Sequence, residues 1–291
     1  MNAFLAKLLL NQPVVTDGAW GTQIQMLGLE AGACPDAWNL DNPAAIEKVA
    51  SSYVQAGSRV ILTNTFGANR LMLERHGLSG KAAAINRAGA EISRKAAGDN
   101  AVVFGSMGPT GKMFFNGEVS EEDLSAAFEE QATALAEGGV QGIVIETISE
   151  LDEARIALKA AKKTGLPVVV SLVYDSGQEF DRTMMGTTPE EAANALKESG
   201  ADVIGANCGM GIEFIMTVTK RLRAATDLPV WIKPNAGMPE VADGKVSYSI
   251  NPAQFAEHAK DVVMAGANFI GGCCGTSPAF ISELRKAIAQ K

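Results

Sequence analysis

Two cysteines stand side by side in the segment GGCCGTSP, which covers residues 271–278 of the 291-residue chain. Neighbouring side chains of an ordinary extended strand point to opposite faces, so Cys273 and Cys274 would point apart. The three glycines of this segment relax the restriction, because glycine reaches backbone angles that let adjacent thiols converge. Another cysteine, Cys208, ends a separate apolar run, so three thiols could meet if the fold brings the two segments together.

Three convergent thiols would suit a zinc ion. Zn²⁺ favours tetrahedral thiolate coordination, and three protein ligands leave the open fourth position of a catalytic site. The chain has two histidines, His76 and His258, so an all-sulfur set is the natural one. The alternatives are that Cys208 is a small buried side chain, and that the adjacent pair forms a strained disulfide or one buried and one exposed thiol. The spacing lacks the CxxC pattern of structural zinc sites and the pattern of zinc deaminases, so these alternatives stay open.

The charge of such a site favours one kind of chemistry. Three thiolates around Zn²⁺ give a net negative site, which generates hydroxide poorly but holds a substrate thiolate well. Zinc lowers the pKa of the substrate thiol, while the sulfur-rich environment leaves the bound sulfur nucleophilic. Transfer of an alkyl group to a thiol is the chemistry that we expect, and hydrolysis is the second candidate.

The elements that must position the thiols follow a repeating pattern. Short runs that are apolar on both faces are typical of buried parallel strands. They cover residues 13–17, 59–64, 101–106, 141–147, 166–172, 201–208, 228–235 and 268–274. Segments with helical spacing of apolar residues lie between them, at 42–57, 120–139, 149–165 and 188–200.

This alternation predicts an α/β protein with a (β/α)₈ TIM barrel, formed by a single domain over residues 1–291. The competing fold is a doubly wound open sheet. That fold would usually carry a glycine-rich dinucleotide turn after its first strand, and the segment DGAWGTQ at residues 17–23 lacks the required spacing.

Active sites of such barrels lie where the strands end, and several predicted strands end in polar residues. Asp17 and Glu146 are placed to hold an ammonium group, although Asp17 could instead cap its turn and Glu146 could pair with a lysine. Asn64 and Asn235 could bind substrate or hold loops in shape, and Asn235 could also fill the fourth position of the metal. Cys34 has no companion thiol in its segment and is expected to be an ordinary small side chain.

Composition narrows the class of partner. Hydrophobic residues make up 47% of the chain and charged residues 20%, which is typical of a folded protein with a large core. The formal net charge of −8 argues against nucleic acid and against an anionic membrane surface. The sequence has neither an apolar run long enough to span a membrane nor a leader with a cleavage site. We therefore expect a cytoplasmic protein with a small-molecule partner.

Seven motifs, in this order and spacing, resemble those of the homocysteine S-methyltransferase family: TDGAWGTQIQ, TNTFGANR, GSMGPTGK, IETISEL, GANCGMG, KPNAGMPE and GGCCGTSP. Within it, they are most similar to the homocysteine-binding module of cobalamin-dependent methionine synthase. The resemblance implies a barrel that binds Zn²⁺ through Cys208, Cys273 and Cys274 and takes homocysteine as its thiolate. It also implies that Asp17 and Glu146 hold the amino acid.

The resemblance leaves the methyl donor open. Cobalamin-dependent methionine synthase continues into folate, cobalamin and activation modules, whereas no folate or corrinoid site can be identified in this chain. The motifs TNTFGANR and PNAGMP favour a methyl group brought by a separate corrinoid protein. S-methylmethionine or betaine is the alternative donor, and a non-catalytic protein that binds homocysteine for a partner is the alternative function.

Overall fold

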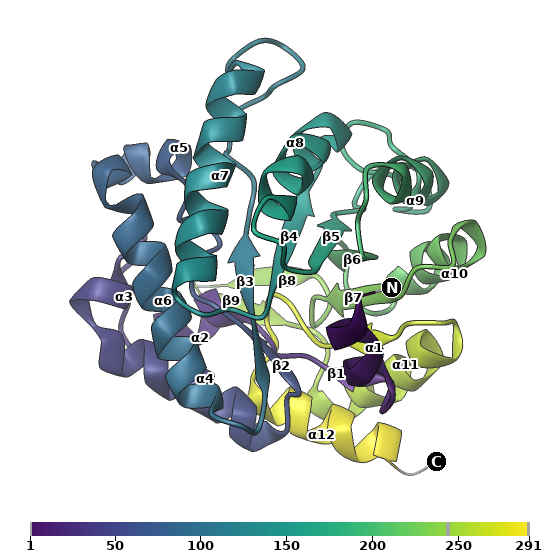
Figure 1. Cartoon of the computed structure of the whole chain (residues 1–291). Helices are drawn as coiled ribbons and strands as arrows, with labels where there is room; N and C mark the ends of the chain where they lie inside the picture. Colours follow the sequence, from purple (N-terminus) through teal and green to yellow (C-terminus); the bar gives the residue numbers. More distant parts are fainter. Residues whose placement is uncertain (1, 243–244, 290–291) are drawn as a thin grey trace.

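Eight parallel strands form a nearly closed barrel in the computed structural model, which describes residues 2–242 and 245–289 (Figure 1). The strand order is β1-β10-β7-β6-β5-β4-β3-β2, and a bridge between Thr16 and Val60 joins the two edge strands. The strands are β1 (Val14–Val15), β2 (Val60–Leu62), β3 (Val102–Met107), β4 (Gly142–Ile148), β5 (Val168–Leu172), β6 (Val203–Cys208), β7 (Val230–Pro234) and β10 (Phe269–Ile270). The predicted barrel and its eight strands are confirmed.

The helices surround the strands (Figure 1). They are α1 (Ala3–Leu9), α2 (Trp20–Met26), α3 (Trp38–Asp41), α4 (Pro43–Ala56), α5 (Arg70–Leu73), α6 (Ala82–Ala97), α7 (Glu121–Glu137), α8 (Leu151–Lys162), α9 (Pro189–Glu198), α10 (Ile215–Ala225), α11 (Pro252–Met264) and α12 (Pro278–Ala289). Two short 3₁₀ helices cover Glu74–His76 and Ser79–Lys81. Local signals set the helix starts: the side chain of Ser120 caps α7, and Thr188 and Glu191 form a capping box on α9.

Large side chains fill the interior of the barrel, so it is a packed core. Every strand of the barrel contributes to this cluster, which contains Val14, Val60, Leu62, Phe104, Val144, Val169, Val203, Trp231 and Phe269. The rings of Phe104 and Trp231 stack with centroids 6.3 Å apart. The opposite face of each strand packs against the helices in a second, larger cluster. Burial on both faces explains why the strands read as continuous apolar runs.

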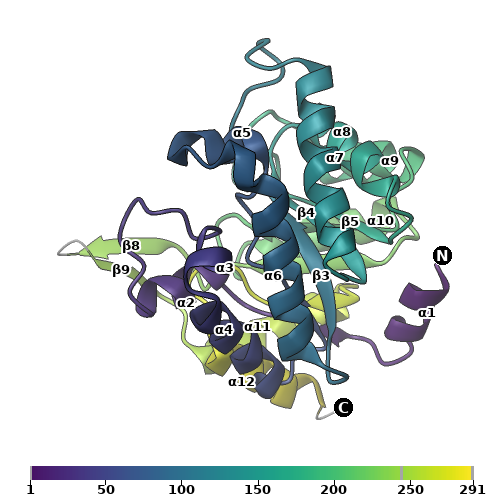
Figure 2. The same cartoon turned by 60° about the vertical axis from the view of Figure 1, so that its left-hand side comes forward.

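Helix α1 closes the amino-terminal end of the barrel. Its residues Leu5 and Leu8 are buried in the interior cluster, and the ring of Phe4 lies 6.2 Å from that of Phe104. Figure 2 shows α1 at the end of the molecule opposite to the β8–β9 hairpin.

A β-hairpin lies outside the regular alternation of strands and helices. Strands β8 (Pro239–Ala242) and β9 (Lys245–Tyr248) pair antiparallel between β7 and α11, and the sequence pattern did not predict them.

The predicted single domain over 1–291 includes residues 1, 243–244 and 290–291, which lie outside the described residues. Within the described part of the chain, the helices are too short or too polar to cross a bilayer.

Replacing Leu5 by Ala should lower the free energy of unfolding by about 2–5 kcal/mol, because it opens a cavity beneath the barrel core. Leu10 ends the same helix but is 80% exposed, so Leu10→Ala is the matched control and should change little. Urea unfolding followed by circular dichroism measures both. Equal effects of the two substitutions would show that α1 does not close the barrel.

Candidate active site

Three cysteines meet at the carboxyl-terminal end of the barrel strands. Cys208 is the last residue of β6, and Cys273 and Cys274 follow β10, so that only β7 lies between the two segments. The three sulfur atoms all lie within 4.8 Å of one another, and the Sγ atoms of Cys208 and Cys273 are 2.8 Å apart. The sequence prediction that these thiols converge is therefore met by the geometry.

The environment shifts the pKa values of the thiols in opposite directions. Hydrogen bonds from Cys208 and Cys273 lower the pKa of Cys274 below its usual range. The hydrogen bond to Cys273 raises the pKa of Cys208, and burial adds to the effect. A cluster that concentrates negative charge on one exposed sulfur is suited to attract a cation.

Asn235 holds the two cysteine segments together. Its Nδ2 donates to the carbonyl oxygen of Gly209, next to Cys208, at 2.8 Å. Its Oδ1 accepts from the backbone N–H of Cys274 at 3.0 Å. The side chain is buried and therefore fixes the distance between the segments. Asn235 was expected to hold loops in shape, to bind substrate or to bind the metal. Its hydrogen bonds in the structure connect loops, and its contact with substrate or metal stays a prediction.

Two of the three non-glycine residues with a left-handed φ in the described part of the chain lie near the ends of β4 and β6, and the third is Phe180. Cys208 has a φ of 58° and Thr147 a φ of 64°, in the left-handed region that non-glycine residues rarely adopt. Such a conformation costs roughly 1–3 kcal/mol and persists only where the surroundings impose it. At Thr147 the side chain of Asn207 contributes, because its Oδ1 accepts from the Thr147 N–H at 2.9 Å and its Nδ2 donates to the Thr147 hydroxyl at 2.6 Å. The β4–β5 register shifts at the same place, between Ile145 and Ile148.

Among the glycines beside the cysteine pair, Gly275 carries the left-handed conformation, with a φ of 80°. A Cβ atom there would also lie 2.3 Å from the ring of Tyr248. The ring therefore rests directly on the backbone that follows Cys274. Burial raises the pKa of Tyr248 to about 12, and the charge of the nearby Cys274 adds to the effect. Strand β9 thus covers one side of the thiol cluster with an aromatic ring.

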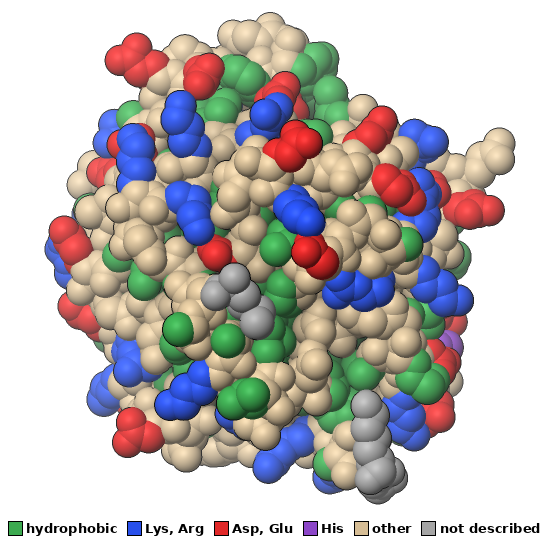
Figure 3. All heavy atoms as spheres, turned by 45° about the vertical axis from the view of Figure 1, so that its right-hand side comes forward, with side chains coloured by type: hydrophobic (Ala, Val, Ile, Leu, Met, Phe, Trp, Pro, Cys, Tyr) green, Lys and Arg blue, Asp and Glu red, His purple; other side chains and the backbone are tan. Residues whose placement is uncertain are grey.

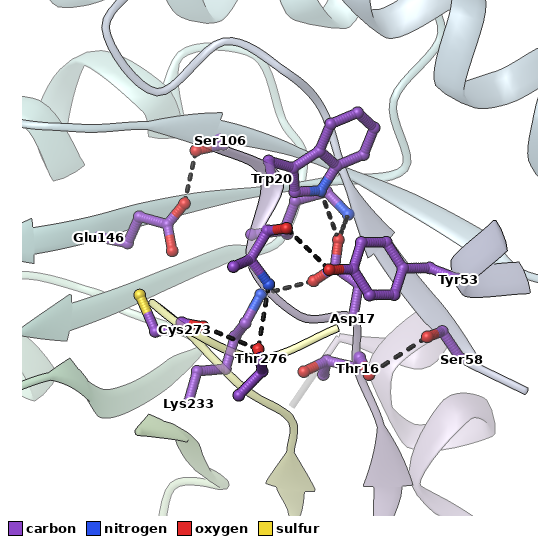
Figure 4. A network of polar contacts seen from close by, with 12 residues as sticks. Thr16, Asp17, Trp20, Tyr53, Ser58, Ser106, Glu146, Lys233, Cys273 and Thr276 are labelled. Atoms are coloured by element: carbon purple, nitrogen blue, oxygen red, sulfur yellow. Dashed lines mark hydrogen bonds and ion pairs between the residues drawn. The ribbon is translucent and has the colours of Figure 1, made fainter. Parts of the chain in front are cut away.

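Asp17 is completely buried, and internal donors occupy both of its oxygens (Figure 4). Oδ1 pairs with the Lys233 ammonium at 2.5 Å, while Oδ2 accepts from Trp20 Nε1 at 2.8 Å and from the N–H of Leu62 at 2.7 Å. Asp17 was expected to hold an ammonium group, and the group it holds in the structure is that of Lys233. Its direct contact with substrate stays a prediction.

Glu146 lies beside this ion pair with more of its carboxylate free. Its Oε1 accepts from the Ser106 hydroxyl at 2.5 Å, and Figure 4 shows Glu146, Lys233 and Cys273 around one space. Burial raises the pKa of Glu146 to about 7, against the lowering effect of Lys233. Burial also disfavours the charged form of Lys233, but Asp17 and Glu146 outweigh it and raise the pKa of Lys233. A further cation near Glu146 would favour its ionised form.

The profile of a known family matches this chain. The model of the homocysteine S-methyltransferase family covers residues 14–288. The chain belongs to the homocysteine S-methyltransferase family. This confirms the resemblance seen in the motifs.

Two curated proteins to which the chain is similar are considerably longer than it is. The chain is 28% identical over 307 residues to the methionine synthase of Mycobacterium leprae and 29% identical over 306 residues to that of Mycobacterium tuberculosis. Each match covers 98% of this chain and 25% of the relative. The chain therefore spans about a quarter of the length of these relatives.

A solved structure of similar size has the same fold. The homocysteine methyltransferase MmuM from Escherichia coli, in its metallated form, superimposes with a TM-score of 0.82 at 24% identity. The match covers 98% of this chain and 99% of that one, and the oxidized form of MmuM gives the same values.

Asn64, like Asn235, uses its side-chain amide within the protein. Nδ2 donates to the carbonyl of Pro35 at 2.8 Å and to Oδ1 of Asn39 at 3.0 Å. Asn39 in turn donates to the carbonyl of Asn64 at 2.7 Å. Asn64 therefore joins the loops after β1 and β2, which was the alternative interpretation of the sequence, and substrate binding by Asn64 stays a prediction. Cys34, in the same loop, is buried away from the thiol cluster.

Sequence reasoning missed Lys233, Ser106 and Tyr248. A signal existed for Lys233, because a lysine inside the otherwise apolar run LPVWIKPN must be buried and paired. Ser106 also ends an apolar run, but serine is too common there to be noticed. No pattern indicated Tyr248, because it becomes part of the site only through the unpredicted hairpin.

Replacing Lys233 by Met should lower the free energy of unfolding by about 3–5 kcal/mol, because it leaves the buried Asp17 without its cation. The double variant Asp17→Asn, Lys233→Met should recover part of that loss. Lys95→Met, which breaks an exposed pair with Glu47, is the control and should cost about 1 kcal/mol or less. Urea unfolding at pH 7 measures these three variants and the single variant Asp17→Asn. Strictly additive losses at Asp17 and Lys233 would contradict the coupling.

Proposed function

We propose that this chain is a zinc-dependent S-methyltransferase that methylates homocysteine to methionine. The observation that carries the proposal is the convergence of three sulfur atoms within 4.8 Å at the mouth of a barrel of this family. The metallated form of MmuM supports a metal in this fold. Clustered free thiols are suited to a reducing compartment, so the cytoplasm is the predicted location.

The donor set fits Zn²⁺. Cys208, Cys273 and Cys274 would hold the ion, because three thiolates leave one of its four tetrahedral positions for a ligand from outside. Zn²⁺ bound there would supply a Lewis acid that lowers the pKa of a substrate thiol. Asn235 keeps the two cysteine segments at a fixed distance, so the ligand set is assembled before the substrate arrives.

The chain's own charges can orient the amino acid. Glu146 is the proposed partner of the substrate ammonium group, since its second oxygen faces the space beside Cys273 (Figure 4). Asp17 keeps Lys233 in place by their ion pair, so that one fixed cation remains beside Glu146. The new S–C bond forms as the donor's bond to the methyl carbon breaks and its electron pair leaves with the donor. That displacement requires no general acid from the protein.

Exposed apolar side chains at the mouth support a donor carried by another protein. They lie on the loops that follow β2, β3, β5, β6 and β7, and they are Phe66, Met113, Phe115, Met184, Met185, Phe214 and Met238. Exposed apolar side chains that gather around a site are typical of protein interaction surfaces. A separate methyl-corrinoid protein is therefore the proposed donor, and S-methylmethionine or betaine is the alternative.

The test of the function is methionine formation from homocysteine by the zinc-loaded protein, with methylcobalamin, S-methylmethionine and betaine offered separately. Mass spectrometry of the product identifies the donor. Cys208→Ala should lose zinc and at least about 100-fold of the activity, since direct metal ligands matter more than the residues that support them. Cys34→Ala, the matched control, should keep both. Full activity of Cys208→Ala, or equal zinc loss in both variants, would refute the proposal.

The donor surface has its own test. Phe115→Ser should lower kcat/KM about tenfold with a methylated corrinoid protein as donor, the effect of one interface anchor, and leave kcat/KM for free methylcobalamin unchanged. Met264→Ser is the control, because Met264 is 73% exposed at the other end of the barrel. Equal losses with both donors would point to damage in the site instead of a docking surface.

A further inference from the structure

A cavity opens at the amino-terminal end of the barrel, opposite the thiol cluster. Its volume is about 610 Å³. It lies between the end of α4, the segments that precede β1 and β2, and the last turn of α12. Arg59 and Arg285 lie on its wall, and no carboxylate is found among the described residues that line it.

These two arginines differ from the others in the chain. In the part of the chain that the structure describes, neither Arg59 nor Arg285 has a hydrogen-bond or ion-pair acceptor for its guanidinium. Arg70, Arg87, Arg155 and Arg221 pair with carboxylates, and the remaining arginines donate to carbonyl or side-chain amide oxygens. Figure 3 shows acidic and basic side chains intermingled over one face of the molecule. Both side chains are exposed, so their guanidinium groups are open to a ligand from solution in a protein whose formal net charge is −8.

The backbone holds Arg285 at the cavity. A Cβ atom at Gly57 would lie 2.3 Å from Cδ and 2.8 Å from Nη1 of Arg285, so that side chain crosses the glycine directly. Gly57 also has a φ of 101° and ends α4, a position that favours glycine. The negative end of the α4 dipole favours a guanidinium at this position.

The rest of the wall combines uncharged donors with apolar surface. The side chains of Asn11, Gln55 and Asn100 line the cavity and have no partner among the described residues. The apolar part of the wall consists of Pro13, Val15, Val54, Ile288 and Ala289. Such a mixture suits a molecule with an anionic group and an uncharged body.

We infer that this cavity is a binding site for a small organic anion, in which Arg59 and Arg285 clamp a phosphate or carboxylate group. Guanidinium groups bind both anions through paired charge-assisted hydrogen bonds. The site is independent of the methyltransferase proposal, because it lies at the other end of the barrel. Its wall nevertheless includes Val15, and the N–H of Arg59 donates to the Val15 carbonyl at 2.7 Å, in the strand that leads to Asp17.

Isothermal titration at low ionic strength tests the site with three probes: phenyl phosphate, phenylacetate and neutral benzyl alcohol. We expect saturable binding of at least one of the two anions in the millimolar range or tighter, and none of the alcohol. The tighter anion identifies the group that the site prefers. Absence of saturable binding by both anions, or equal binding of the alcohol, would overturn the proposal.

Variants locate the binding. Arg59→Gln and Arg285→Gln should each weaken the bound anion about tenfold or more, the value of one charge-assisted hydrogen bond. Arg155→Gln removes the same charge from an exposed pair elsewhere and should leave binding unchanged. Equal weakening by all three variants would mean that only net charge attracts the anion.

The unmodified protein gives a second measurement that does not depend on the folding of variants. Phenylglyoxal, which modifies free guanidinium groups, should react first with Arg59 and Arg285. Phenyl phosphate or phenylacetate should protect these two arginines and no others, as peptide mass spectrometry would show. Failure of the bound anion to protect them would overturn the proposal.

Discussion

The arrangement of the mouth depends on the buried ion pair between Asp17 and Lys233. Asp17 uses its carboxylate to hold β7, α2 and the backbone of β2, and its carbonyl oxygen accepts from Gly272, directly before the cysteine pair. One residue therefore sets the relative positions of four segments. Burying a charged carboxylate here is costly, and it is tolerated because Lys233 neutralises Asp17 and internal donors occupy both of its oxygens.

The second organising feature is strain that the fold concentrates at the reacting end. Cys208 and Thr147 both adopt left-handed conformations, and Asn207 ties them together. Cys208 therefore brings its sulfur to the cysteine pair that follows β10 from a backbone conformation that a non-glycine residue rarely adopts. The packed interior supplies the stability that this local distortion consumes.

Much of this could be predicted from sequence, for identifiable reasons. The strands are apolar on both faces, and barrel chemistry gathers at strand ends, so Cys208, Cys273 and Cys274 could be grouped from their positions at the ends of apolar runs. The hydrogen-bond and ion-pair partners of the site residues could not be predicted from the sequence. Which acceptor a buried Asn235 or Asp17 finds depends on tertiary contacts between segments far apart in the chain. The β8–β9 hairpin escaped prediction because its strands are only four residues long and carry no extended alternation.

Helix α1, which closes the amino-terminal end of the barrel, restricts how ligands can reach the thiol cluster. Because α1 closes one end and aromatic rings fill the interior, ligands can approach the thiol cluster from the carboxyl-terminal end of the strands and not through the barrel. In the proposed function, acceptor, donor and product would share this opening, and a donor protein bound there would enclose the acceptor beneath it. The closed barrel would thus set the order in which ligands bind and are released, and this order follows from the shape of the fold and not from any single side chain.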